Sequence, residues 1–238
     1  MTGRAEMESF IEKAGEFFTS PALMSEVGFS ILDTLYMTVV STLMAYVIGL
    51  PLGLLLVVTA KNGIKPMVWL NRILGFIVNF LRSVPFIILI IWVFPVTRVI
   101  LGKTTGSPAT LIVPLVISAF PFVARMVEQS ANEIDRGVIE AAQSMGASNW
   151  QIVTRVIIRE TKPSLIVGAA ITLTTIIGYT TMGTVIASGG IGALGITYGH
   201  YRFNRFILTL AVVVLVIMVQ LFQSIGMKLA KKFDKRYR

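Results

Sequence analysis

The chain has 238 residues, of which 55% are hydrophobic and only 14% are charged, and its mean hydropathy is +0.79. Soluble domains carry about 25% charged residues, so the composition excludes an ordinary soluble enzyme and predicts an all-α integral membrane protein, while the absence of cysteine excludes a disulfide scaffold and thiolate metal sites. The net charge of +9 is better explained by the Lys and Arg that collect in cytoplasmic loops than by binding to nucleic acid.

Residues 1–30 are predicted to form an N-terminal amphipathic segment at the membrane interface. Within it, Ser9–Phe18 combines aromatic and charged residues at helical spacing, which is typical of an interfacial helix. The first 20 residues are acidic and amphipathic, so they do not resemble a cleavable signal peptide.

Gaps between charged residues predict about five transmembrane helices within residues 31–228. The expected spans are Tyr36–Ala60, Ser83–Thr97, Thr104–Ala124, about Ser164–Thr184, and Phe206–Met227. The second span is short, but the arginines at its ends can snorkel to the interfaces. Residues 66–81 allow two alternatives, an interfacial helix or an extension of the second span that breaks near Pro85. The glycine-rich stretch after the fourth span is expected to be a re-entrant or surface loop.

The distribution of Lys and Arg predicts the orientation. With the N-terminus outside and the C-terminus inside, the inner segments hold 15 Lys and Arg and the outer segments hold 6. The basic tail at residues 229–238 is then cytoplasmic, and it is expected to contact anionic membrane lipid.

The loop at about residues 126–163 is the longest polar segment, with ten charged residues from Arg125 to Lys162. Its pattern predicts a helix, a glycine turn and a second helix, with Pro163 at the entry to the fourth span. The boundary signals are Asp135 as an N-cap, Gly146 as a C′ glycine and Ser148–Gln151 as a capping box. On shape alone, a plain cytoplasmic helical hairpin is the alternative.

The run Glu140-Ala141-Ala142, followed after three residues by Gly146, resembles the EAA loop of bacterial ABC-importer permeases. The resemblance implies the type I importer permease fold. A homodimer is expected because five helices from one chain cannot readily enclose a path for an amino acid, whereas ten can. The resemblance also implies that these four residues form a coupling helix that docks on an ATP-binding cassette ATPase subunit, of which two copies are expected. The sequence departs from the family pattern at Arg159, where a proline is common.

Three further segments are similar to the methionine-uptake permeases, namely Arg82–Phe86, Gly178–Met182 and Gly189–Phe203. The resemblance implies a permease of the bacterial cell membrane that imports L- or D-methionine delivered by an extracytoplasmic binding protein. It also implies that this chain is not an enzyme and holds no cofactor, because ATP belongs to the partner subunit. Permeases for quaternary amines carry a similar glycine run, which makes such a substrate the alternative.

Two faces of the fourth span are distinguished by helical spacing. One face is expected to line the substrate pathway, and it comprises Thr172, Thr175, Tyr179 and Met182. Met182 is expected to act as an apolar gate, and the alternative is that its side chain packs on lipid or in the protein core. The adjacent face is expected to be a close-packed helix seam, because its residues are small; it comprises Thr174, Gly178 and Thr181.

An ion-coupled secondary transporter is the rival class of function. Such a transporter is expected to carry acidic residues in its spans, but residues 36–124 and 161–233 contain no Asp or Glu. The chain has no Gly-x4-Gly-Lys-Ser/Thr phosphate loop, so ATP hydrolysis is expected on another subunit. His200 is the single histidine, and we expect it to form a hydrogen bond in the outer loop rather than to bind a metal.

Overall fold

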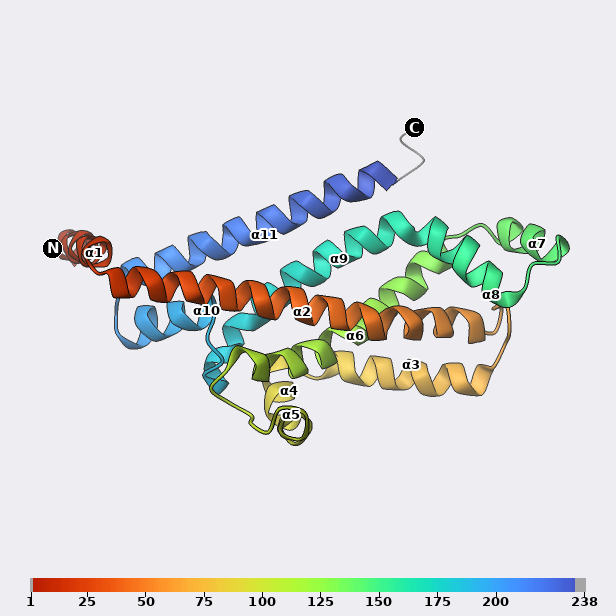
Figure 1. The fold of residues 1–238 in the computed structure, drawn as a ribbon, viewed down its shortest axis with the longest axis horizontal. Coiled ribbons are helices and arrows are strands. Elements are labelled where there is room, and N and C mark those ends of the chain that lie inside the picture. Colours follow the sequence, from red (N-terminus) through yellow and green to blue (C-terminus); the bar gives the residue numbers. More distant parts are fainter. Residues whose placement is uncertain (1, 234–238) are drawn as a thin grey trace. The chain divides into compact units, whose positions relative to one another are not determined.

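The computed structural model describes residues 2–233, and these residues are helical throughout apart from short connections (Figure 1). The helices are α1 (Thr2–Thr19), α2 (Pro21–Thr59), α3 (Val68–Ser83), α4 (Phe86–Trp92), α5 (Phe94–Leu101), α6 (Pro108–Asn132), α7 (Arg136–Ser144), α8 (Asn149–Gln151), α9 (Ile158–Thr180), α10 (Ile191–Leu194) and α11 (Arg205–Phe233). Segments Ile152–Ile157 and Gly195–Tyr201 are π-helical, and Thr181–Ile186 is a 3₁₀ helix. The predicted all-α fold class is confirmed.

Four helical stretches in the described residues are long and apolar enough to cross a membrane. They are Pro21–Thr59, Pro108–Asn132, Asn149–Ile186 and Arg205–Phe233. The pair α3 and α4 is bent by 107°, and it makes a fifth span if the two helices count as one. These stretches agree with the predicted polytopic membrane protein, whereas the orientation remains a prediction.

The predicted second span, Ser83–Thr97, is not a single helix. Val84 has extended backbone angles (φ −78°, ψ 124°) and interrupts the helix directly before Pro85. The proline ring disfavours helical angles in the preceding residue, which explains the break. Residues 66–81 fall largely within α3, and the chain breaks directly before Pro85, while the interfacial helix and the extension of the second span both remain predictions for these residues.

The helices that contain the predicted third and fourth spans are longer than those spans. Helix α6 continues past Ala124 to Asn132, and one continuous helix runs from Asn149 to Ile186 with Pro163 inside it. Before Pro163, this helix contains the π-helical segment Ile152–Ile157. A π-helical turn is wider than an α-helical one, and helices often bend at such a segment. Much of residues 126–163 is therefore helical, and the bounds of the polar loop relative to the membrane remain a prediction.

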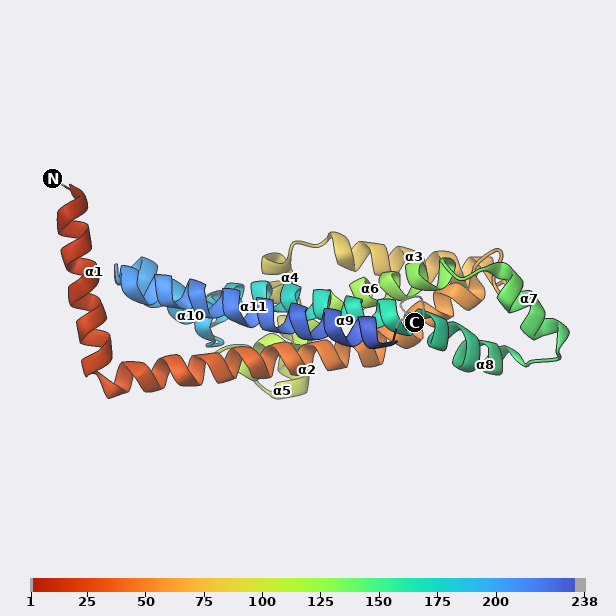
Figure 2. The same cartoon turned by 90° about the horizontal axis from the view of Figure 1, so that it is seen from above.

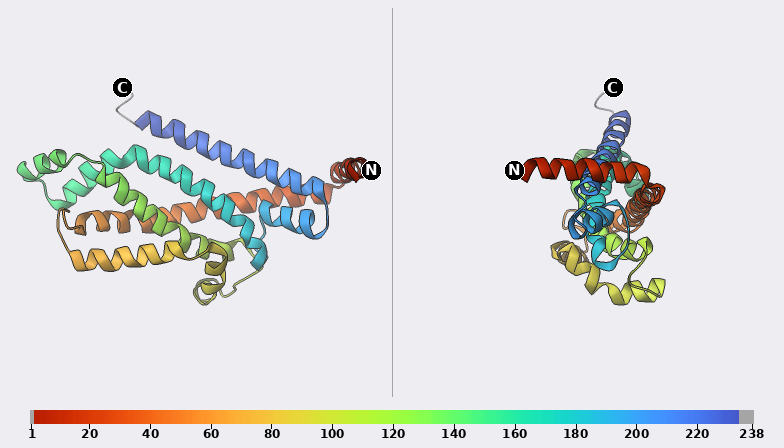
Figure 3. Two further views of the ribbon diagram at one scale, coloured as in Figure 1. Left: turned by 180° about the vertical axis from the view of Figure 1, so that it is seen from behind. Right: turned by 90° about the vertical axis from the view of Figure 1, so that its left-hand side faces the viewer.

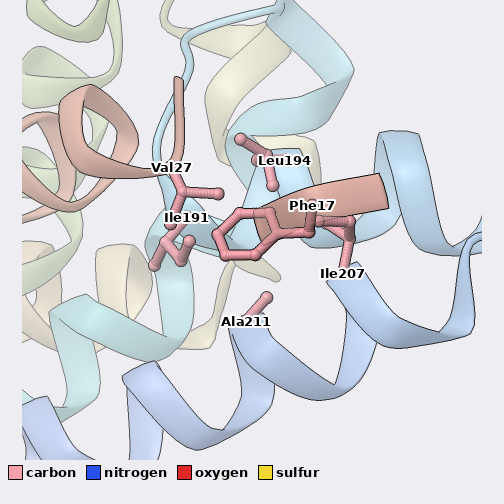
Figure 4. Packing of buried hydrophobic residues seen from close by; sticks show 6 residues of the cluster. All are labelled: Phe17, Val27, Ile191, Leu194, Ile207 and Ala211. Carbon is pink, nitrogen blue, oxygen red and sulfur yellow. The ribbon is translucent and has the colours of Figure 1, made fainter. Parts of the chain in front are cut away.

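The chain divides into two compact units. Unit 1 comprises the residues up to Ser41, Ile90–Leu115 and Thr174–Leu221. Its core joins α1, α2, α10 and α11 (Figure 4), through Phe17, Val27, Ile191, Leu194, Ile207 and Ala211. The chain turns sharply between α1 and α2 (Figure 2), and the Phe17 ring packs on Phe206 with centroids 5.4 Å apart.

The glycine-rich stretch forms part of the unit 1 core, so the expectation of a surface loop is wrong. Ile191 is fully buried, and its N–H donates a 2.9 Å hydrogen bond to Oγ1 of Thr34. Gly190 adopts φ +94°, and a Cβ there would lie 2.9 Å from Cε of Met37. Glycine is therefore required for the turn to approach α2 this closely.

Unit 2 comprises Thr42–Leu89, Val116–Leu173 and the residues from Phe222 onward. Helix α2 approaches α6 at two glycines, since a Cβ on Gly49 or Gly53 would lie 2.6 or 2.5 Å from a carbonyl oxygen of α6. Helix α3 is tied to α2 by Nδ2 of Asn71, which donates a 2.7 Å hydrogen bond to the carbonyl oxygen of Leu56. These contacts hold the ends of α2 and α6 beside the polar loop.

The described end of α11 packs on α9 within unit 2. The Lys162 ammonium lies 3.8 Å from the ring centroid of Phe233, which is a cation–π contact. Residues 234–238 of the predicted basic tail lie outside the described residues.

Candidate functional site

Helix α7 begins and ends where the sequence predicts. The Asp135 carboxylate accepts a 2.8 Å hydrogen bond from the N–H of Gly137, which caps the first turn. At the other end, the N–H of Ala147 donates to the carbonyl of Ala142 (3.1 Å) and that of Gly146 to the carbonyl of Gln143 (2.9 Å). This pair of bonds is a Schellman motif, and Gly146 supplies the left-handed residue it needs, with φ +78°.

The predicted capping box is present at the start of the next helix. The Ser148 N–H donates a 2.8 Å hydrogen bond to Oε1 of Gln151, and the Gln151 N–H donates a 3.3 Å bond to Oγ of Ser148. The chain then continues through the π-helical segment into α9. The elbow of α7, turn and α8 stands at the end of α6 and the start of this helix (Figure 3).

The three residues of the Glu-Ala-Ala run face different ways. Ala142 is buried in a cluster with Val57, Ala131, Ile152 and Ile157, which anchors α7 to α2 and α6. Glu140 and Ala141 are exposed. Ala142 therefore packs against the rest of the protein, whereas Glu140 and Ala141 lie on the outer surface of α7.

Two large apolar side chains at the elbow are exposed and were missed by the sequence analysis. Met145 is 81% exposed and Trp150 is 75% exposed. Each lies next to a predicted cap residue in the polar loop, and a large apolar residue within a polar segment is the signal that could have found them. Exposed Trp and Met next to buried alanines form a surface suited to protein contact.

The predicted pathway residues differ in their surroundings. Thr172 belongs to unit 2, where it is buried and its hydroxyl donates a 2.8 Å hydrogen bond to the carbonyl of Gly168. Thr175, Tyr179 and Met182 belong to unit 1; Tyr179 is half-buried, while the other two are exposed. Thr172 thus has a packing role in this chain, and only the remaining three present surface.

The predicted helix seam comprises Thr174, Gly178 and Thr181. At Gly178, no other helix of the described chain packs closely. A Cβ on Gly178 would meet nothing within 4 Å. The close approach lies instead between Thr181 and Gly192, where a Cβ on Gly192 would be 2.4 Å from Cγ2 of Thr181. Gly49 and Gly53 are among the glycines that let long helices approach, and their G-x-x-x-G spacing in an apolar helix is a signal present in the sequence.

His200 lies against Tyr201, with ring centroids 5.3 Å apart. Across the described residues, no group of three or more His, Cys, Asp or Glu side chains is placed to hold a metal ion.

Comparison with known proteins assigns the family. A family model described as the inner membrane component of binding-protein-dependent transport systems matches residues 45–238. A probable D-methionine transport system permease protein of Pasteurella multocida is 46% identical over 217 residues, covering 91% of this chain and 100% of that protein. Its counterpart in Vibrio cholerae is 42% identical over 204 residues, covering 86% of this chain and 90% of that protein.

Solved structures agree with this assignment. A structure of the MetNI methionine ABC transporter in an inward-facing conformation matches with a TM-score of 0.88 and 42% identity, covering 91% of this chain and 100% of that one. An amino acid ABC transporter shares the fold, with a TM-score of 0.74 at 14% identity. The chain therefore belongs to the family of inner membrane components of binding-protein-dependent transport systems.

Proposed function

We propose that this chain is the multi-pass inner-membrane permease subunit of an ATP-driven importer of methionine. The observation that carries the proposal is the similarity along nearly the whole chain to permeases named for D-methionine transport and to a methionine ABC transporter. The substrate would arrive on an extracytoplasmic binding protein, and ATP would be hydrolysed by a separate ATPase subunit.

Uptake by cells whose other methionine importers are deleted tests the substrate. Cells that express this chain with its ATPase and binding protein should accumulate labelled methionine, and excess unlabelled L- or D-methionine should suppress the uptake. Cells that lack only this chain are the control. Suppression by glycine betaine but not by methionine would contradict the assignment and favour a quaternary amine.

We propose that the elbow is the contact with the ATPase. Glu140 and Ala141 face outward on α7, and Met145 and Trp150 expose apolar surface beside them. Trp and Met side chains are enriched in the centres of protein interfaces. Trp150→Ala should therefore reduce co-purification of the ATPase with the permease, whereas Trp92→Ala, which removes an exposed Trp of α4, should not. Equal recovery of the ATPase with Trp150→Ala would contradict this role.

We propose that two copies of the chain assemble with the pathway between them. The exposed face of α9 supports this arrangement, because Gly178 leaves open space and Thr175 and Met182 are exposed beside it. Five spans from one chain are few to enclose an amino acid, and a closed two-fold dimer would present two elbows to two ATPase copies.

Cysteine cross-linking tests the dimer, because the chain has no cysteine of its own. Gly178→Cys should form a disulfide-linked dimer in membranes, whereas Thr172→Cys, at a buried position on the same helix, should not. A complex that contains one copy of the chain by native mass measurement would contradict the proposal. Within the dimer, Met182 is the proposed gate, and Met182→Ala should raise the ATPase rate in the absence of substrate.

A further inference from the structure

A cavity of about 510 Å³ lies in unit 2, between the end of α2, the loop that follows it, the end of α6 and helix α7. Its walls include the buried side chains of Val57, Ala131 and Ile157. Ile134 and Ile139 extend this apolar surface and are half-buried. The volume falls within the range of about 300–1,000 Å³ that is usual for small-molecule sites.

The rim of the cavity is charged. Lys61 and Arg136 bring two positive charges and Glu140 brings one negative charge, and all three side chains are exposed. Among the described side chains, none of the three forms an ion pair or a hydrogen bond. Arg136 and Glu140 are four residues apart on α7, so they share the face that lines the cavity with Ile139 and Gln143.

We propose that this cavity binds an α-amino acid zwitterion with an apolar side chain. The carboxylate of the ligand would pair with Lys61 and Arg136, its ammonium group with Glu140, and its side chain would cover the isoleucine wall. A purely apolar ligand would leave the three rim charges without partners, and a phosphate would place its charges beside the Glu140 carboxylate. The arrangement of charges therefore selects a ligand that carries one charge of each sign.

The bound amino acid would join three elements that are separate in sequence. Lys61 follows α2, Ala131 lies near the end of α6, and Arg136 and Glu140 belong to α7. A ligand that contacts all three restrains α7, so amide hydrogen exchange in residues 136–144 should slow when the site is filled.

Equilibrium binding of labelled methionine to the full-length chain in nanodiscs of neutral lipid, without ATPase or binding protein, tests the site. The choice of methionine as the probe rests on the proposed function. N-acetylmethionine lacks the ammonium group and methionine methyl ester lacks the carboxylate, so each should bind at least about tenfold more weakly, the effect of one charged hydrogen bond. Equal binding of the three compounds would overturn the proposal.

Matched variants distinguish this cavity from the substrate pathway. Lys61→Gln removes a rim charge, and Lys65→Gln removes an exposed charge from the same loop outside the cavity. Ile139→Trp fills the cavity, whereas Val138→Trp adds the same bulk on an exposed position of α7. Lys61→Gln and Ile139→Trp should weaken binding about tenfold or more while the two controls retain it. Binding that is unchanged in all four variants would overturn the proposal.

Two further outcomes separate this inference from the proposed function. If the chain binds no methionine while cells that carry it still import methionine, the cavity proposal fails and the proposed function stands. If labelled methionine binds the unmodified chain but Ile139→Trp binds it as tightly as Val138→Trp does, the bound methionine lies elsewhere, and the cavity proposal is likewise overturned. If the unmodified transporter does not import methionine, that result contradicts the proposed function instead.

Discussion

The guanidinium of Arg125 on α6 donates a 3.0 Å hydrogen bond from Nη2 to the backbone carbonyl of Gly75 on α3. Its Nε donates a 3.1 Å bond to Oδ1 of Asn79, and its Nη1 forms an ion pair with Glu128. About one fifth of each side chain of the ion pair is exposed. One arginine therefore joins α3 to α6 and leaves none of its nitrogens without a partner.

Replacing Arg125 with Gln should destabilise the permease. The Glu128 carboxylate would remain partly buried without its cation, and α3 would lose its bonds to α6, so we expect a loss of about 1–3 kcal/mol in the free energy of unfolding. Thermal unfolding of the purified protein in detergent should show a lower midpoint. Arg155→Gln, at an exposed position, is the control and should unfold as the wild type does. Equal midpoints for all three proteins would contradict the structural role.

Arg125 also explains which parts of the fold the sequence could predict. Ending each predicted span at the first charged residue does not predict where the helix ends, because a charge that is paired inside the protein does not terminate a helix. Two of the three partners of Arg125, Asn79 and the carbonyl of Gly75, belong to α3 and lie more than 40 residues away in the chain, so no local pattern reveals them. Helix α6 therefore continues to Asn132.

The elbow of α7, turn and α8 was predictable because its signals are local. An N-cap, a C′ glycine and a capping box each depend on bonds between residues two to five positions apart. The contact between Gly192 and Thr181 and the burial of Ile191 depend on how separate elements pack. A glycine-rich sequence is compatible with both a surface loop and a close-packed turn, so composition could not distinguish them.

The approach of α2 to α6 should fail when Gly53 gains a side chain. A Cβ at this position would lie 2.5 Å from the carbonyl oxygen of Ala124 and 2.6 Å from Cβ of Val127. Gly53→Val should therefore cost about 1–3 kcal/mol and reduce the yield of folded protein from membranes. Gly28→Val adds the same side chain to α2 at a site with nothing within 4 Å, and its yield should match the wild type. A normal yield of Gly53→Val would show that the helices separate at no cost.

Stability at alkaline pH should depend on Tyr198. Its hydroxyl donates a 2.7 Å hydrogen bond to the Glu26 carboxylate, and this bond, with burial and the nearby charge, raises the pKa of Tyr198 above its usual value. The folded protein then holds the phenolic proton more tightly than the unfolded chain does. The resulting stability is present below about pH 10 and is lost as the pH rises through the raised pKa.

Unfolding midpoints measured from about pH 8 to pH 11 test this dependence. The midpoint of the wild type should fall more steeply above about pH 10 than that of Tyr198→Phe, which has no phenolic proton to lose. Tyr201→Phe, at an exposed position next to His200, is the control and should follow the wild type. Parallel curves for the wild type and Tyr198→Phe would contradict the role of the bond to Glu26.

Gly146 should decide whether the elbow transmits ATP hydrolysis to transport. The residue has φ +78°, and a Cβ added to it would meet nothing within 4 Å. A side chain at this position would therefore be destabilising only because of the positive φ, and not because of a steric clash. The positive φ costs about 1–2 kcal/mol for an ordinary residue and less for Asn. Uptake in proteoliposomes should therefore fall in the order wild type, Gly146→Asn, Gly146→Ala and Gly146→Val, at equal amounts of inserted protein.

Gly102 supplies the control for Gly146, because it also has a positive φ (+72°), nothing within 4 Å of an added Cβ, and a position directly after a helix, in this case α5. Gly102→Val imposes the same backbone strain far along the chain from the elbow. If strain acts through the elbow, Gly146→Val should lower uptake per ATP hydrolysed while Gly102→Val leaves this ratio at the wild-type value. An equal loss of coupling in both variants would mean that strain alone disables the permease, and Gly146 would then have no special role in docking the ATPase.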